Sequence, residues 1–183
     1  MVETTLIAAS VFLLGQGAWI HAKAALSQVL LHRAWGRTLA GERQVRPWPW
    51  ADTWPVARLR LPSAGGDFIV LAGATGRTLA FGPGHLDGSA APGGPGNCVL
   101  SAHRDTQFAC LRRLRPGDAA ILETSDGRQT TYRVQGFAVV DRKRRIPDAA
   151  PGGCDLTLVT CYPFDAIAPG GPQRYVVRAS AGR

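Results

Sequence analysis

The sequence of residues 119–141 is AAILETSDGRQTTYRVQGFAVVD. Apolar and β-branched residues fill both halves of this stretch, 119–123 and 130–141, as is typical of strands. Between them lies Ser-Asp-Gly at 125–127, a sequence that favours a tight turn. We therefore predict a β-hairpin, the basic unit of an antiparallel sheet.

Further strands are expected on both sides of the hairpin, because short apolar or alternating runs recur along the chain. They cover residues 57–61, 68–71, 97–101, 156–160 and 174–178. A short helix with apolar Phe108, Leu111 and Leu114 is expected to end before Pro116, and the glycine-rich residues 81–96 are expected to be loop. Seven or so strands with one short helix in about 125 residues predict an all-β domain that forms a closed or nearly closed barrel.

The composition agrees with a folded, turn-rich domain. A chain of 183 residues can form one domain of ordinary size with an appendage. Its 45% hydrophobic and 19% charged residues exclude a disordered chain, and 22 glycines with 13 prolines exclude a helical bundle. The excess of basic residues on the predicted barrel is modest, fourteen Lys and Arg against ten Asp and Glu over residues 61–183, and the basic run RKRR at 142–145 contains no aromatic residue. We expect no nucleic-acid partner and favour a solvated loop or contact with an anionic membrane surface.

The amino-terminal residues differ in character from the rest of the chain. Residues 4–22 contain no Asp, Glu, Lys or Arg, and a helix of that length spans roughly 28 Å, close to the hydrocarbon thickness of a bilayer. We predict a retained transmembrane anchor over 1–22, a juxtamembrane helix and Pro/Trp-rich connector over 23–55, and the barrel domain over 56–183. A buried helix and a cleaved signal peptide are the alternatives for the anchor.

Aromatic and basic residues near the anchor bear on its placement. Trp19 and Trp35 are expected at the membrane interface. The connector RPWPWADTWP at 46–55 either packs against the first strand or holds the domain at a fixed height above the membrane. A strict positive-inside count would put the carboxyl-terminal domain in the cytoplasm, because four basic residues follow the span: Lys23, Arg33, Arg37 and Arg43. This count conflicts with a domain outside the cytoplasm. The conflict would be resolved if the start site lacks some basic residues that lie upstream of the span.

Three reactive residue types recur at predicted strand ends. His103 follows the strand at 97–101, Cys161 closes the strand at 156–160, and Arg174 opens the last strand. An imidazole and a guanidinium near a thiol favour its nucleophilic thiolate form. The guanidinium can also bind a carbonyl oxygen as it becomes an oxyanion. These residue types form a candidate catalytic set, but their spacing in the sequence does not by itself bring them together.

The sequence TLVTC at 157–161 is preceded by a His at the end of an earlier strand and followed by an Arg that opens the next strand. This pattern resembles the sortase transpeptidase family. Four longer stretches are similar to the subgroup of that family found in Gram-negative bacteria: PWPWADTWPVARL (47–59), TLAFGPGHLDGSAAPG (78–93), SAHRDTQF (101–108) and TCYPFDAIAPGGPQRYVV (160–177). The resemblance extends from about residue 23 to residue 180.

The resemblance implies a closed β-barrel of about eight strands with short helices, held in the inner membrane by an N-terminal transmembrane helix with the catalytic domain in the periplasm. Cys161 would attack a C-terminal sorting signal of a secreted protein and form a thioacyl enzyme. His103 would protonate the departing amine and deprotonate the amine acceptor, and Arg174 would hold the substrate backbone and the oxyanion. These steps need no metal and no cofactor. Residues 142–154 lie where sortases read the sorting signal.

The chain departs from the family pattern at a few positions. Ala102 stands where many sortases have glycine before the catalytic His. Cys98, Cys110 and Cys154 are additional, and we expect them to be small buried hydrophobic residues with at most one disulfide among them. Cys154 is the candidate for a reversible disulfide, because it lies in the loop that precedes Cys161.

Other interpretations of these residues remain open. His85 and His103 with Cys98 and Cys161 could form a tetrahedral zinc site, although no close ligand pair is present. His85 is expected to be a hydrogen-bonded loop residue, and so not catalytic.

Asp105 and Arg178 are alternative site residues, and two other functions are alternatives to the sortase hypothesis. Asp105 could orient the imidazole or cap the following helix, and capping is favoured. Arg178 shares a strand face with Arg174 and is the alternative for the arginine role. The same residues could instead serve a membrane-anchored cysteine peptidase that uses water as acceptor, or the chain could be a membrane-tethered binding module without catalytic activity.

Overall fold

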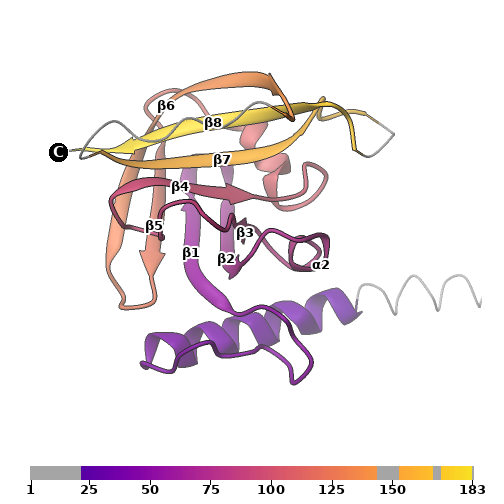
Figure 1. Cartoon of the computed structure of the whole chain (residues 1–183), viewed down its shortest axis with the longest axis vertical. Coiled ribbons are helices and arrows are strands. Elements are labelled where there is room, and N and C mark those ends of the chain that lie inside the picture. The colour runs from indigo at the N-terminus through magenta and orange to yellow at the C-terminus, as the bar shows by residue number, and fades with distance from the viewer. Residues whose placement is uncertain (1–21, 144–152, 167–169, 183) are drawn as a thin grey trace, which may run out of the picture.

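Eight strands among the described residues close into one barrel (Figure 1). The computed structural model describes residues 22–143, 153–166 and 170–182. Around the barrel the strands follow the order β1-β2-β3-β4-β7-β8-β6-β5, and β5 pairs with β1. Their bounds are Pro55–Leu61 (β1), Gly66–Ala72 (β2), Gly84–His85 (β3), Gly96–Ser101 (β4), Ala119–Thr124 (β5), Gln129–Asp141 (β6), Cys154–Tyr162 (β7) and Gln173–Ala181 (β8). The predicted closed all-β barrel is confirmed.

The predicted hairpin forms β5 and β6, which pair antiparallel. Its turn is closed by the Gly127 N–H, which donates to the Thr124 carbonyl over 2.9 Å, and Gly127 has a φ of 79° that favours glycine. Hydrogen bonds from Thr124 and Arg128 lower the pKa of the Asp126 carboxyl to about 2. The predicted turn sequence therefore supplies both the backbone conformation and the side-chain acceptor that the turn needs.

Three short helices connect the strands. They are η1 (Pro62–Ala64), α2 (Gly76–Leu79) and η2 (Gln107–Arg113), of which η1 and η2 are 3₁₀ helices. The helix expected around Phe108 is η2, and it ends at Leu114, before Pro116. Phe108 and Leu111 are fully buried, as the apolar spacing indicated.

The prediction that residues 81–96 are entirely loop is wrong at β3. This two-residue strand pairs parallel with β2 and antiparallel with β4, so it closes the barrel between them. A Cβ on Gly84 would lie 2.3 Å from the carbonyl oxygen of Gly73 and 2.9 Å from the Ala74 Cα. The glycine that suggested loop is therefore the residue that lets the two backbones approach closely enough to pair.

The barrel interior is one apolar cluster to which nearly every strand contributes. Tyr132, Phe108 and a set of leucines are its largest fully buried side chains, and Leu156 and Leu158 supply the part from β7. In sheet order β7 lies between β4, with which it is parallel, and β8, with which it is antiparallel. These three strands lie side by side across the upper half of Figure 1, and they position the candidate site.

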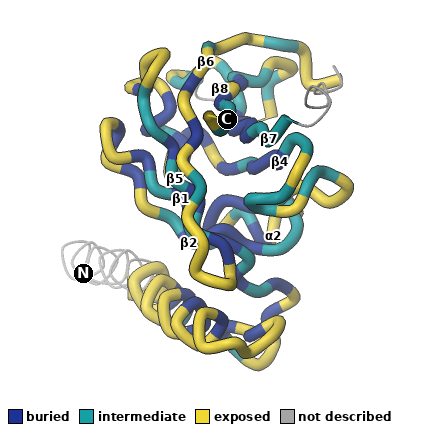
Figure 2. Tube along the Cα trace, turned by 90° about the vertical axis from the view of Figure 1, so that its left-hand side faces the viewer, coloured by how far each residue is buried: buried dark blue, intermediate teal, exposed yellow. Residues whose placement is uncertain are grey.

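A helix over residues 22–39 packs on the outside of the barrel (Figures 1 and 2). Leu31 and Trp35 lie against Ile69 and Leu71 of β2, with Phe81 at the edge of the cluster. The expectation that Trp35 lies at a membrane interface is wrong, because only 4% of this residue is exposed and it packs on the barrel. Figure 2 shows the exposed side of this helix turned away from the barrel.

The Pro/Trp-rich connector follows this helix and packs against the barrel before β1 begins. Trp48 makes an edge-to-face contact with Phe81 at 4.7 Å, and the Thr53 hydroxyl donates to the Ala72 carbonyl over 2.7 Å. Trp50, in contrast, is 82% exposed. The expected membrane span at 4–22 lies outside the described residues, apart from residue 22. In the part of the chain that is described, we find no helix with the length and apolar character needed to cross a bilayer.

Candidate active site

The thiol of Cys161 lies on the outer face of the barrel wall. Along β7, Leu156 and Leu158 belong to the barrel core, whereas Val159 packs in a separate cluster with Val99 and Val176. Because side chains alternate between the two faces of a strand, Cys161 shares the outer face with Val159. The thiol is partly exposed there, as a nucleophile must be.

Arg174 lies directly opposite Cys161. The two residues form a cross-strand pair between β7 and β8, and side chains of such a pair project from the same face with Cβ atoms roughly 5 Å apart. The Arg174 Nη1 group donates to the backbone carbonyls of Gly171 and Gln173, each over 2.8 Å. These bonds hold the guanidinium at the start of β8, the strand position that pairs with Cys161.

His103 follows β4, which pairs with β7 on the side opposite β8. The parallel pairing of β4 with β7 puts Ser101 level with Val159, so two residues further on His103 comes level with Cys161. The Ala102 N–H continues the pairing by donating to the Val159 carbonyl over 3.2 Å. His103 then leaves the sheet with an exposed side chain. Cys161 and Arg174 thus lie on the neighbouring strands β7 and β8, and His103 lies just beyond the end of β4, on the other side of β7.

A groove on the outer face includes Arg174 in its lining, which contains neither Cys161 nor His103. It forms a cavity of about 190 Å³ whose floor is apolar, with Val99, Val159 and Val176 at its base. Leu86 and Ala74 line one side. A floor built from neighbouring strands suits an extended peptide that carries apolar side chains. The sequence prediction missed this floor, because it treats the strand at 156–160, LTLVT, as buried and does not tell its two faces apart.

The other cysteines differ from Cys161 in their surroundings, and all four are free thiols. Burial raises the pKa of Cys98 to about 12 and also raises that of Cys110. Cys154 is half-buried, with its sulfur 3.4 Å from the Tyr132 hydroxyl, and it donates to the Gly94 carbonyl over 3.1 Å. Cys98 and Cys110 are buried small residues, as expected, and a thiol with a raised pKa is a poor nucleophile at neutral pH.

Several alternative assignments lose support from the geometry. Asp105 accepts a hydrogen bond from the Arg104 Nε over 3.2 Å, while the N-cap of η2 is Thr106, which makes no side-chain capping bond. The predicted capping role of Asp105 is therefore wrong. Arg178 shares the outer face with Arg174, but it pairs with Thr157, four residues from Cys161 along β7.

The zinc hypothesis also lacks a ligand set in the described ranges, where no three His, Cys, Asp or Glu side chains converge. His85 is instead hydrogen-bonded: its Nε2 lies 2.8 Å from the Ala90 carbonyl and 3.1 Å from the Ser89 hydroxyl. The expected hydrogen bonding of His85 is confirmed, but its expected place in a loop is wrong, because His85 belongs to β3.

Comparison with known proteins identifies the family of the chain. The model of the sortase domain family matches residues 59–181, which include all strands except the start of β1. The chain belongs to the sortase family. It is 32% identical over 120 residues to Sortase D of Bacillus subtilis, a match that covers 65% of this chain and 60% of that relative's length.

Solved sortase structures have the same barrel. Sortase C-1 from Actinomyces oris is 30% identical with a TM-score of 0.60, and the match covers 70% of this chain and 75% of that one. Sortase A from Corynebacterium diphtheriae is 28% identical with a TM-score of 0.64, covering 79% and 68%. A Clostridium perfringens Sortase D5 transpeptidase, at 19% identity, shares the fold with a TM-score of 0.68 over 87% of this sortase and 99% of its own chain.

Proposed function

We propose that this chain is a cysteine transpeptidase that cleaves a C-terminal sorting signal of a secreted protein and transfers the product to an amine acceptor. The observation that carries the proposal is the cross-strand pair of Cys161 and Arg174, with His103 leaving the adjacent strand at the same level. This arrangement puts a nucleophile between a proton carrier and a fixed positive charge. The groove that Arg174 helps to line gives an extended peptide a place to lie.

In the first half-reaction the Cys161 sulfur attacks the scissile carbonyl carbon as a thiolate. A carbon–sulfur bond forms, and the carbonyl oxygen becomes an oxyanion beside the Arg174 guanidinium, whose planar, permanent charge stabilises it. The tetrahedral intermediate collapses as the carbon–nitrogen bond breaks. His103, as imidazolium, gives its proton to the departing amine. The product is a thioester between Cys161 and the residue on the acyl side of the cleaved bond, and the carboxyl-terminal fragment leaves as the amine.

In the second half-reaction an acceptor amine takes the place of the departed one. His103, now neutral, removes a proton from the amine as its nitrogen attacks the thioester carbon. The carbon–sulfur bond breaks, the Cys161 thiolate leaves, and a new amide is formed. Water attacking the same thioester would give a free carboxylate instead, which is the peptidase alternative. The exposed position of His103 leaves room for either acceptor.

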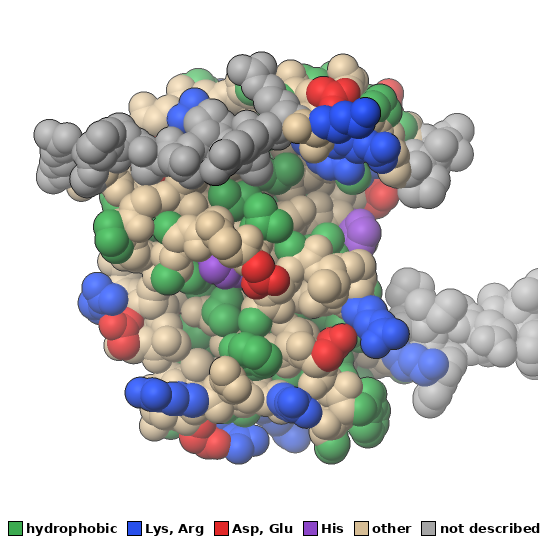
Figure 3. All heavy atoms as spheres, in the orientation of Figure 1, with side chains coloured by type: hydrophobic (Ala, Val, Ile, Leu, Met, Phe, Trp, Pro, Cys, Tyr) green, Lys and Arg blue, Asp and Glu red, His purple; other side chains and the backbone are tan. Residues whose placement is uncertain are grey.

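We extend the proposal to location. The apolar residues 4–22 would anchor the chain in the inner membrane by a single span, with the barrel in the periplasm, and the chain would belong to the sortase subgroup of Gram-negative bacteria. The four stretches quoted above support the subgroup. Lys and Arg side chains gather along the lower edge of the molecule (Figure 3), and they suit an anionic membrane surface.

The activity is tested by mixing the full-length protein with a pooled library of decapeptides and a biotin-tagged primary amine. Mass spectrometry is expected to find peptides truncated and joined to the amine. Cys161→Ala is expected to give none of these products. Cys154→Ala, the matched control, removes a half-buried thiol outside the site and is expected to keep the ligation. Free carboxylates alone, with the amine in excess, would favour the peptidase, and ligation by Cys161→Ala would contradict the mechanism.

The location is tested separately by expressing the full chain and a chain without residues 1–22. The full chain is expected to stay in the membrane fraction after washing at alkaline pH, and the shortened chain to become soluble. Protease added to spheroplasts is expected to digest the barrel domain. A barrel protected from that protease would place the domain in the cytoplasm, as the positive-inside count indicated.

A further inference from the structure

Arg104 is a buried charge directly beside His103. Only 4% of its side chain is exposed, and it is the single charged residue that is buried among the described part of the chain. A guanidinium removed from water needs hydrogen-bond acceptors, or it destabilises the fold. Its partners therefore indicate what the charge is for.

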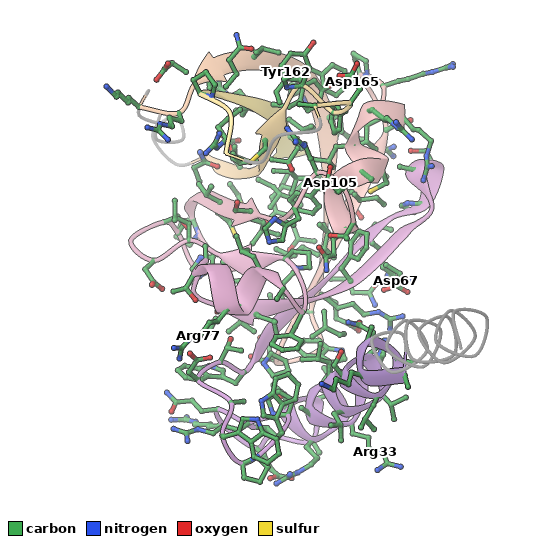
Figure 4. All side chains as sticks on the ribbon, turned by 90° about the vertical axis from the view of Figure 1, so that its right-hand side faces the viewer. Arg33, Asp67, Arg77, Asp105, Tyr162 and Asp165 are labelled. Atoms are coloured by element: carbon green, nitrogen blue, oxygen red, sulfur yellow. The ribbon has the colours of Figure 1, made fainter. Side chains whose placement is uncertain are left out.

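Those partners lie on the segment that follows Cys161. The Arg104 Nη1 group donates to the Pro163 carbonyl over 2.9 Å, and its Nη2 group donates to the Ala166 carbonyl over 2.5 Å. The remaining Nε group donates to Asp105 over 3.2 Å. Figure 4 shows Asp105 at the same end of the molecule as Tyr162 and Asp165, which flank Pro163 in the sequence. The side chain of Arg104, the residue after His103, thus bonds to two backbone carbonyls shortly after Cys161.

Ala102, the residue before His103, is hydrogen-bonded to β7. The Thr160 hydroxyl donates to the Ala102 carbonyl over 2.8 Å in a buried hydrogen bond. The His103 carbonyl itself accepts a bond of 3.0 Å from the Phe108 N–H, which fixes the chain at the start of η2. The backbone on either side of His103 is therefore tied to the backbone on either side of Cys161.

We propose that Arg104 is a positioning residue that sets the distance between the His103 imidazole and the Cys161 thiol. The proposal rests on the proposed function only in using His103 as the acid/base group. The planar fork of arginine reaches two carbonyls three residues apart, which the single nitrogen of lysine cannot do. Loss of one bond would let the segments carrying the two catalytic groups move relative to one another, and a misplacement of about 1 Å costs roughly a hundredfold in rate.

The experiment compares Arg104→Lys with Arg113→Lys. Arg113 is the matched control, because it also donates a guanidinium hydrogen bond to a backbone carbonyl, that of Ala64, but joins η2 to η1 and does not contact β7. Two readouts are taken: the rate of iodoacetamide alkylation of Cys161 as a function of pH, and kcat and KM for a peptide selected from the decapeptide library. Melting temperature is recorded for each variant.

For Arg104→Lys we expect kcat to fall about tenfold or more with KM little changed, and the pH profile of alkylation to move toward that of His103→Ala. Arg113→Lys is expected to keep the wild-type profile and kcat even if it melts at a lower temperature. A wild-type profile for Arg104→Lys, or an equal loss in both variants, would overturn the proposal. If Arg104→Lys does not fold, Thr160→Val removes the other tie at constant volume and is expected to move the profile in the same direction.

The alkylation measurement needs no peptide substrate, so the two proposals can fail separately. A shifted alkylation profile in a protein that ligates no peptide would leave Arg104 as a positioning residue and overturn the transpeptidase proposal. Normal peptide ligation together with an unchanged alkylation profile in Arg104→Lys would support the transpeptidase proposal and overturn the positioning role of Arg104.

Discussion

The guanidinium of Arg174 is fixed at the strand position that pairs with Cys161 by backbone bonds to Gly171 and Gln173. Its role as an oxyanion group depends on a planar donor that is aimed by those bonds and stays charged at every working pH. Lysine at this position would keep the charge but would lack a second donor nitrogen. A point charge on a flexible stem cannot hold a developing oxyanion in a fixed direction.

We expect Arg174→Lys to lower kcat/KM for peptide ligation by about a hundredfold, a magnitude typical of a lost oxyanion donor. Arg178→Lys is the control, because Arg178 lies on the same face of β8 but opposite Thr157, and it is expected to stay within about twofold of wild type. Steady-state kinetics on the same peptide measure both. Equal losses in the two variants would assign the oxyanion role elsewhere.

The buried thiol of Cys98 makes the stability of the barrel depend on pH. Burial raises its pKa from 9.0 to about 12, so the folded state resists its ionisation while the unfolded chain does not. Folding stability from this group is complete below pH 9 and is lost as the pH rises from 9 toward 12. Burial also raises the pKa of Tyr132, which contributes in the same direction.

The free energy of unfolding, measured in urea, is therefore expected to fall between pH 9 and pH 10.5. Cys98→Ala should flatten this fall by about 2 kcal/mol, because each unit of pKa shift corresponds to roughly 1.4 kcal/mol. Parallel slopes in wild type and Cys98→Ala would show that Cys98 does not ionise on unfolding.

At the level of residues, the sequence predicted which side chains would carry the chemistry but not what holds them. His103, Cys161 and Arg174 could be proposed because their types and their places at strand ends are visible in the sequence. Arg104 could not, since a buried arginine and an exposed one look the same until the fold supplies the carbonyls of Pro163 and Ala166.

Strand β3 shows how much of the barrel depends on a very short element. Its two residues connect β2 to β4, and without them the barrel would be open along that line. Gly84 makes the connection possible by lying close to the backbone of Gly73 and Ala74. Ala74 and Leu86, on either side of this contact, also line the groove.

Gly84→Ala is expected to lower stability by about 3 kcal/mol, since the added methyl would overlap backbone atoms that cannot move aside. Gly76→Ala, at the start of α2, is the matched control: its Cβ would meet nothing within 4 Å, and alanine favours helix. We expect Gly76→Ala to melt at or slightly above the wild-type temperature in a thermal scan. A tolerated Gly84→Ala would mean that β3 is not needed for closure.

At the level of elements, strands with clear patterns could be predicted within a few residues, and β3 could not. The alternation in β1 and the turn between β5 and β6 are local signals. β3 forms only because β2 and β4 offer hydrogen-bonding partners, which no local pattern records. In β7 the prediction found the strand but not its two faces, because Leu158 and Val159 are equally apolar although one faces the core and the other faces the groove.

Over the whole molecule, the helix at 22–39 and the candidate site occupy different ends. The helix packs on β2, whereas the site lies on β4, β7 and β8. In Figure 4, Arg33 of the helix lies at the bottom of the view, and Tyr162 lies at the top. Removing the contacts of the helix should therefore affect stability far more than catalysis.

Trp35→Ala is expected to lower the free energy of unfolding by about 3–5 kcal/mol, the usual cost of deleting a buried indole, while kcat at 20 °C stays within about twofold. Trp50→Ala, in the exposed part of the connector, is the control and is expected to change stability by less than about 0.5 kcal/mol. Urea unfolding and peptide ligation measure the two effects. A large loss of kcat in Trp35→Ala would show that the helix reaches the site.

The alternation of β7 has one more consequence, for changes in chain length. A single residue inserted or deleted between Leu156 and Cys161 would slip the strand by one position, turning the thiol toward the leucines and the Thr160 hydroxyl toward solvent. No repacking restores the nucleophile after such a slip. We therefore expect insertions and deletions to be tolerated in the connections before and after this strand and not within it.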